Sequence, residues 1–160
     1  TGDIANARLF GNKAIESDLK AQGLRNETAA AWLKAGKPAS ARATWHRAAD
    51  MAKERAAMLG KRIPLLQQQW KADAGDTAAG REHEILYLQA VFLTAQQWAL
   101  VAQFSRSAVE PEQALLATQQ LQNLLPSLQQ DNRLSALDTD PRLKGSVEQL
   151  KDWQQLVSHP

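Results

Sequence analysis

Cysteine is absent from the 160-residue chain, and glycine, proline and aromatic residues are few. Without cysteine, these residues offer no disulfide framework, no thiolate nucleophile and no zinc ribbon. The sequence holds 8 glycines, 6 prolines, 1 tyrosine and 3 phenylalanines, but 17 glutamines. Because alanine, leucine and glutamine favour helices whereas β-branched and aromatic residues favour strands, this composition predicts an all-α fold.

Long apolar runs are also absent. No stretch approaches the ~20 apolar residues of a membrane-spanning helix, and no signal segment is visible, so we expect no membrane insertion by these residues. The localisation stays open, because helical proteins of the cytoplasm and of the periplasm can both lack cysteine. Apolar residues make up 44% of the chain and charged residues 22%, as in globular proteins. The length suits a single all-helical domain over residues 1–160.

Charge is unevenly distributed along the chain. Residues 1–75 carry 13 lysines and arginines against 7 acidic residues, a net +6, and residues 76–160 carry 6 against 10, a net −4, which together give +2. A basic half is compatible with an anionic partner, although solvated helix faces are the simpler interpretation. The two halves could instead neutralise each other between subunits, as in a homodimer. Nucleic acid is not an expected partner, since no recognition motif is present.

Hydrophobic periodicity divides the chain into helices joined by polar connections. We expect Gly23 to end or kink the first helix, and Gly36 with Pro38 to end the second. Thr77 is expected to cap the central helix, with Asp76 nearly as good a candidate, and Pro111 is expected to open the next helix. The expected helices cover about residues 4–20, 25–35, 45–70, 81–106, 111–128 and 143–157. They predict a helical bundle of about five to six helices.

The clearest pattern is a stripe of residues in alternating four- and three-residue steps: Trp45, Ala49, Ala52, Ala56, Leu59, Ile63, Leu66 and Trp70. It predicts a long helix that packs on its neighbours along its whole length. Gly60 and Pro64 lie about one turn apart, and proline clashes with the preceding turn, so we expect a kink or short break there. The predicted core comprises Trp45, Leu59, Ile63, Leu66, Trp70, Leu88, Phe92 and Trp98.

Residues 29–48 resemble a tetratricopeptide (TPR) hairpin, which consists of two antiparallel helices. Ala29 and Trp32 take the small and aromatic positions of its first helix, Gly36 lies at the turn, and Ala41, Trp45 and Ala48 take the small–aromatic–small positions of its second helix. A second match covers residues 98–126, where Ser105 and Leu121 depart from the pattern. The spacing between the two units does not fit a plain tandem array. We therefore favour the bundle and keep a short TPR-like repeat array as the alternative.

The resemblance also implies a binding surface, because the first helix of each TPR unit lines the concave side. It would place Asn26 and Lys34 from the first unit beside Gln96, Gln103 and Arg106 from the second. Amides and cations of this kind suit an acidic or carboxylate-bearing peptide. The alternative is that these residues are simply solvated positions on helix faces.

Catalytic and cofactor motifs are not found in the sequence. There is no G-x-S-x-G, no P-loop and no G-x-G-x-x-G. His46 and Asp50 lie one helical turn apart, but an isolated pair of this kind is most often a surface contact. Glu82, His83 and Glu84 are consecutive and would point in different directions on a helix. We therefore expect no enzyme activity, no metal site and no cofactor.

Two functions remain open on the sequence alone. The first is a non-catalytic helical module that mediates protein–protein or peptide interaction. The alternative is an extracytoplasmic ligand-sensing helical bundle of a bacterial signalling receptor. Transmembrane segments flanking these residues in a parent protein would favour the sensor, and further helical repeats would favour the interaction module.

Overall fold

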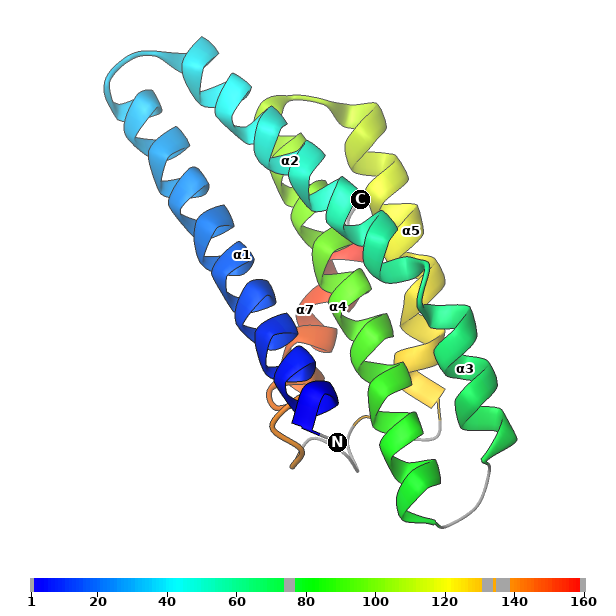
Figure 1. The fold of residues 1–160 in the computed structure, drawn as a ribbon. Helices are drawn as coiled ribbons and strands as arrows, with labels where there is room; N and C mark the ends of the chain where they lie inside the picture. The colour runs from blue at the N-terminus through cyan, green and yellow to red at the C-terminus, as the bar shows by residue number, and fades with distance from the viewer. Residues whose placement is uncertain (1, 74–76, 131–133, 135–138, 159–160) are drawn as a thin grey trace.

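A computed structural model describes residues 2–73, 77–130, 134 and 139–158, with side chains placed from Lys13 onward except those of Ala14 and Ile15. These described residues form helices and turns and contain no strand, which confirms the predicted all-α helical bundle (Figure 1). The helices are α1 (Gly2–Lys34), α2 (Pro38–Gly60), α3 (Ile63–Ala72), α4 (Ala78–Ala108), α5 (Pro111–Gln129) and α7 (Ser146–Ser158). Half of the polar segment at 129–142, residues 131–133 and 135–138, lies outside the described residues.

A single long helix, α1, replaces the two helices expected before Gly36, so the expectation that Gly23 ends or kinks a helix is wrong. A glycine inside a helix costs only about 1 kcal/mol, and the packing of the residues on either side of Gly23 outweighs that cost. Gly36 does terminate the helix, with φ +70°. Its N–H donates to Leu33 O at 3.0 Å and the N–H of Lys37 donates to Trp32 O at 2.9 Å, the two hydrogen bonds of a Schellman cap.

The predicted break between Gly60 and Pro64 is confirmed, because α2 ends at Gly60 and α3 begins at Ile63. Lys61 and Arg62 between them keep α-helical dihedrals, with φ −60° and ψ −23° at Lys61 and φ −85° and ψ −21° at Arg62. The N–H of Arg62 donates to Leu59 O at 3.1 Å. The chain therefore changes direction here without losing its helical course.

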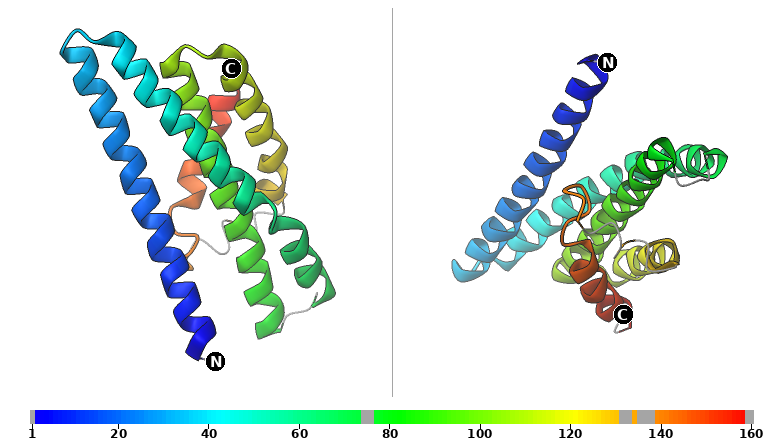
Figure 2. Two further views of the ribbon diagram at one scale, coloured as in Figure 1. Left: turned by 45° about the horizontal axis from the view of Figure 1, so that its top comes forward. Right: turned by 90° about the horizontal axis from the view of Figure 1, so that it is seen from below.

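The central helix is α4, as predicted. Thr77 caps it by accepting a hydrogen bond from the Gly80 N–H at 3.0 Å. Helices α2, α3, α5 and α7 pack around α4, whereas α1 packs mainly on α2. Figure 2 shows the N-terminal end of α1 extending away from the other helices. By length and composition α4 is also apolar enough to cross a membrane, but 67% of its most apolar window is buried inside the molecule.

Two kinds of side chain fill the interior. On the side of α1 and α2, an "alanine seam" of fully buried small residues packs on α4; it consists of Ala29, Ala41, Ala48, Ala49 and Ala52. On the side of α5 and α7, a "leucine core" of fully buried large residues surrounds α4; it consists of Leu88, Leu121, Leu128, Leu134 and Leu143.

The predicted core list is correct for Trp45, Leu88 and Phe92, which are buried. The other five, Leu59, Ile63, Leu66, Trp70 and Trp98, are half-buried, and all of them except Leu59 pack against the core. Four of them belong to the lower part of the heptad stripe, where α3 lies at the margin of the bundle and has no fully buried residue. Trp70 stacks on Tyr87 of α4 with ring centroids 5.1 Å apart, so the stripe does face α4, but solvent reaches its outer edge.

Candidate functional site

One face of α4 is covered only partly by the other helices. Six residues follow one another there in alternating three- and four-residue steps and form what we call the α4 row: Leu86, Gln89, Leu93, Gln96, Leu100 and Gln103. The first five are half-buried and Gln103 is exposed. At 1.5 Å per residue the row is about 25 Å long. Alternating leucine and glutamine at heptad spacing gives this face an apolar seam with regularly placed amides.

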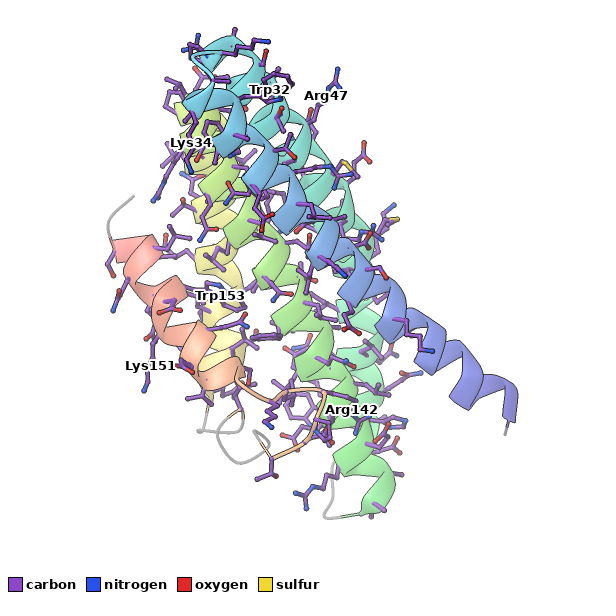
Figure 3. All side chains as sticks on the ribbon, turned by 90° about the vertical axis from the view of Figure 1, so that its left-hand side faces the viewer. Trp32, Lys34, Arg47, Arg142, Lys151 and Trp153 are labelled. Atoms are coloured by element: carbon purple, nitrogen blue, oxygen red, sulfur yellow. The ribbon has the colours of Figure 1, made fainter. Side chains whose placement is uncertain are left out.

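The upper part of the α4 row opens into a cleft between α1, α4 and α7. The cleft has a volume of about 430 Å³, and its lining residues are Leu19, Gln96, Ala99, Leu100, Gln103, Gln149, Asp152, Trp153, Gln155 and Leu156. The ring of Trp153 packs on Phe92 with centroids 5.0 Å apart. Figure 3 shows Trp153 on α7, beside α4. The lining of the cleft thus combines an aromatic side chain with four glutamine side chains.

The glutamines of this region interact with one another across helices. Gln96 of α4 donates from Nε2 to Oε1 of Gln149 on α7 at 3.2 Å, and Gln22 of α1 donates to Oε1 of Gln97 at 3.0 Å. The carbonyl oxygens of Gln96 and Gln22 are buried and accept no hydrogen bond within the described part of the protein. A buried acceptor without a partner is costly, and Gln96 lines the cleft whereas Gln22 does not, so the Gln96 amide favours a ligand that supplies N–H or O–H donors.

The lower end of the α4 row is closed by an ionic clamp. Arg142 donates from Nη1 to Glu82 of α4 at 2.8 Å and from Nη2 to Asp140 Oδ2 at 2.8 Å. These bonds fix the turn that precedes α7 against α4. The hydrogen bond from Arg142, opposed by partial burial, lowers the pKa of Asp140 to about 2, and the same interactions raise the pKa of Arg142.

The predicted binding residues do not all share this site. Gln96 and Gln103 line the cleft together. Asn26 faces α2 instead, where its Oδ1 accepts a hydrogen bond from Trp45 Nε1 at 2.9 Å. Lys34 and Arg106 are exposed in the last turns of α1 and α4, at the same end of the bundle (Figures 1 and 3). They therefore lie beyond the upper end of the cleft rather than in its wall.

His46 contacts two acidic side chains. Its Nδ1 lies 2.6 Å from Glu110 and its Nε2 lies 3.3 Å from Asp50. No group of three or more potential metal-ligating side chains lies close enough to hold a metal ion among the described residues. The histidine joins α2 to the connection between α4 and α5, which is a structural contact.

Sequence reasoning missed most of the cleft. The walls from α7, including Gln149 and Trp153, depend on how that helix returns to α4, which no local pattern shows. The α4 row itself has a signal in the sequence, since Leu86, Leu93 and Leu100 are spaced by seven and the glutamines likewise. That signal is hidden because α4 is apolar on most of its other faces.

No family model matches the chain, and neither a curated protein nor a solved structure matches it. The resemblance to TPR hairpins stays a prediction. What the structure establishes is the class of the fold, an all-helical bundle, with a cleft between α1, α4 and α7.

Proposed function

We propose that this chain is a non-catalytic interaction module that binds an amphipathic helical segment of a partner protein along the α4 row. The observation that carries the proposal is the heptad face of α4, half covered by α1 and α7 and opening into the cleft. A row of leucines about 25 Å long matches an apolar stripe on a helix of four to five turns.

The glutamines give such a partner its register. An amide presents both donors and acceptors, and it adapts to polar side chains that flank a leucine stripe. Polar residues inside a coiled-coil seam cost affinity but fix alignment. Gln96 and Gln103, one heptad apart, would serve this role at the upper end of the row.

The charges near the site favour one orientation of the partner helix along the α4 row. Lys34 and Arg106 lie beyond the upper end, whereas Asp152 lies in the cleft wall. An acidic end of the partner helix would lie near the two cations, which steer its approach in a salt-dependent manner. A partner of this kind agrees with the acidic peptide expected from the sequence.

Photo-crosslinking tests the proposal. A photoreactive amino acid replaces Gln103, or Gln119 on the exposed face of α5 as the matched control, and lysate of the source cells is irradiated with each protein. We expect a partner chain captured from position 103 and not from 119, with capture reduced about tenfold at low salt in the Lys34→Glu, Arg106→Glu double variant. Equal capture from both positions, or capture that the double variant and salt leave unchanged, would contradict the site.

A further inference from the structure

A second line of apolar side chains lies on the outside of α2 and α3, away from α4. Met51, Met58 and Leu65 are spaced by seven residues, and their exposed fractions are 41%, 55% and 59%. We call these three residues the outer stripe. Exposed methionines and leucines in line are typical of adaptable helix-binding surfaces.

The outer stripe continues across the break between the two helices. Because Lys61 and Arg62 keep α-helical dihedrals, the seven-residue spacing keeps Leu65 close to the face that Met51 and Met58 occupy. Each seven-residue step spans about 10 Å along a helix. Figure 1 shows α2 and α3, which carry the stripe, as consecutive helices with a change of direction between them.

Charged residues beside the stripe complement one another when two copies are antiparallel. Glu54 and Lys61 flank the stripe on the same side, both are exposed, and neither forms an ion pair within the described part of the protein. A twofold axis at Met58 brings Glu54 opposite Lys61 of the partner subunit, because residues on the same flank meet in an antiparallel pair. The other flank carries Arg55 and the exposed Arg62, and the ion pair of Arg55 with Asp18 offsets the repulsion between Arg62 and Arg55 of the two copies.

We propose that two copies of this chain associate through the outer stripe as an antiparallel pair centred on Met58. Met51 then packs on Leu65 of the partner subunit, and Met58 packs on its own counterpart. The self-complementary order of Glu54 and Lys61 favours a second copy over an acidic helix, which would leave Glu54 repelled. The interface is isologous, as in most homodimers, and it does not involve the α4 row, so it stands independently of the proposed function.

Sedimentation equilibrium of the purified chain tests the proposal by charge exchange. We expect concentration-dependent dimerisation of the wild type, and a dissociation constant about tenfold higher in Glu54→Lys and in Lys61→Glu alone. The double variant Glu54→Lys, Lys61→Glu exchanges the charges and should return to within about threefold of the wild type. Met58→Glu should abolish the dimer, while Leu115→Glu, at an exposed leucine of α5, serves as the control and leaves it unchanged.

Circular dichroism of each variant confirms that it remains helical. A wild type that stays monomeric up to about 1 mM would overturn the proposal and assign the stripe to another partner. A double variant that dimerises no better than the single variants, or a Leu115→Glu variant as weak as Met58→Glu, would overturn it equally.

Discussion

The two sides of α4 are packed in different ways. On one side the alanine seam holds α1 and α2 with side chains that are small and fully buried, and the cross-helix polar contacts include Gln22 with Gln97, Asn26 with Trp45, and the ion pair of Asp18 with Arg55. On the other side the leucine core holds α5 and the turn before α7, and the polar contact is the ionic clamp of Arg142. Small residues let helices approach closely, whereas large ones supply apolar area.

This difference determines which substitutions each side tolerates. The leucine core should be sensitive to loss of volume, and the alanine seam to gain of volume. The face of α4 between the two sides is covered only in part, by α1 and α7, and most of the α4 row is therefore half-buried.

The largest effect is expected from truncating the leucine core. Leu121→Ala removes a fully buried side chain and should lower the free energy of unfolding by about 2–5 kcal/mol. Ile63→Ala, at the half-buried margin, should lower the free energy of unfolding by no more than about 1–2 kcal/mol, which is less than we would expect if Ile63 were fully buried. Urea denaturation of both variants measures the difference. Leu116→Ala, at an exposed position of α5, is the control, and equal losses at Leu121 and Leu116 would show that the core is misplaced.

Enlarging the alanine seam should have the next largest effect. Ala49→Leu places a large side chain between Trp45 and Phe104 and should cost about 1–3 kcal/mol through overpacking. Ala57→Leu makes the same change at an exposed position of α2 and should leave stability within about 0.5 kcal/mol. Thermal unfolding of the pair separates the two cases. If Ala49→Leu were as stable as Ala57→Leu, the helices would not be in close contact there.

The ionic clamp should make the leucine side sensitive to acid. The pKa of Asp140 is lowered from 3.8 to about 2, so its ionised form stabilises the fold above about pH 4, and this contribution disappears as the pH falls towards 2. Asp140→Asn should therefore be less stable than the wild type by about 1–2 kcal/mol at pH 7, with the gap closing below pH 4. Urea titrations of both proteins between pH 2.5 and 7 measure this difference in stability. A gap that does not change with pH would mean that the carboxylate charge contributes nothing.

The smallest effect on stability is expected at two helix C-termini that form the same cap with different residues in the left-handed position. Gly36 ends α1 with φ +70°, and Val109 occupies the corresponding position after α4 with φ 64°, where a β-branched residue is strained. Val109→Gly should raise the free energy of unfolding by about 1 kcal/mol, and Gly36→Val should lower it by a similar or greater amount. Differential scanning calorimetry compares them. Destabilisation by both substitutions would argue that Val109 makes contacts that outweigh its strain.

Much of the fold could be read from the sequence, because caps and breaks are local. Thr77, Pro111 and the break before Pro64 each follow from the chemistry of one residue and its neighbours. The prediction that a helix ends or kinks at Gly23 was wrong, because tertiary packing of α1 outweighs the low helix propensity of glycine. The heptad stripe correctly predicted which side of α3 faces the other helices. It did not predict how far the side chains are buried, because the burial of Ile63 and Leu66 depends on how many helices surround α3.

The candidate site was harder to predict from the sequence than the fold. Gln96 and Gln103 were placed together through the resemblance to a TPR hairpin, and both line the cleft because they lie one heptad apart on α4. Asn26 was assigned to the wrong surface, because its side-chain oxygen accepts a hydrogen bond from Trp45 of α2. Trp153 was not predicted as a site residue, because no sequence pattern shows how α7 returns to α4. Sites that are assembled from distant segments are determined by tertiary structure, which periodicity does not encode.

The most direct test of the α4 row as a binding face is an NMR titration of the isotope-labelled protein, monitored at the side-chain amides of Gln96, Gln103 and Gln149. The probes are two synthetic amphipathic helices of about 18 residues with the same leucine face, one of net charge about −4 and the other about +4. We expect the acidic helix to shift these three resonances and to bind about tenfold more tightly at low salt, with the preference lost in the Lys34→Glu, Arg106→Glu variant. Shifts confined to other faces, or equal binding of both helices regardless of the variant, would contradict the account.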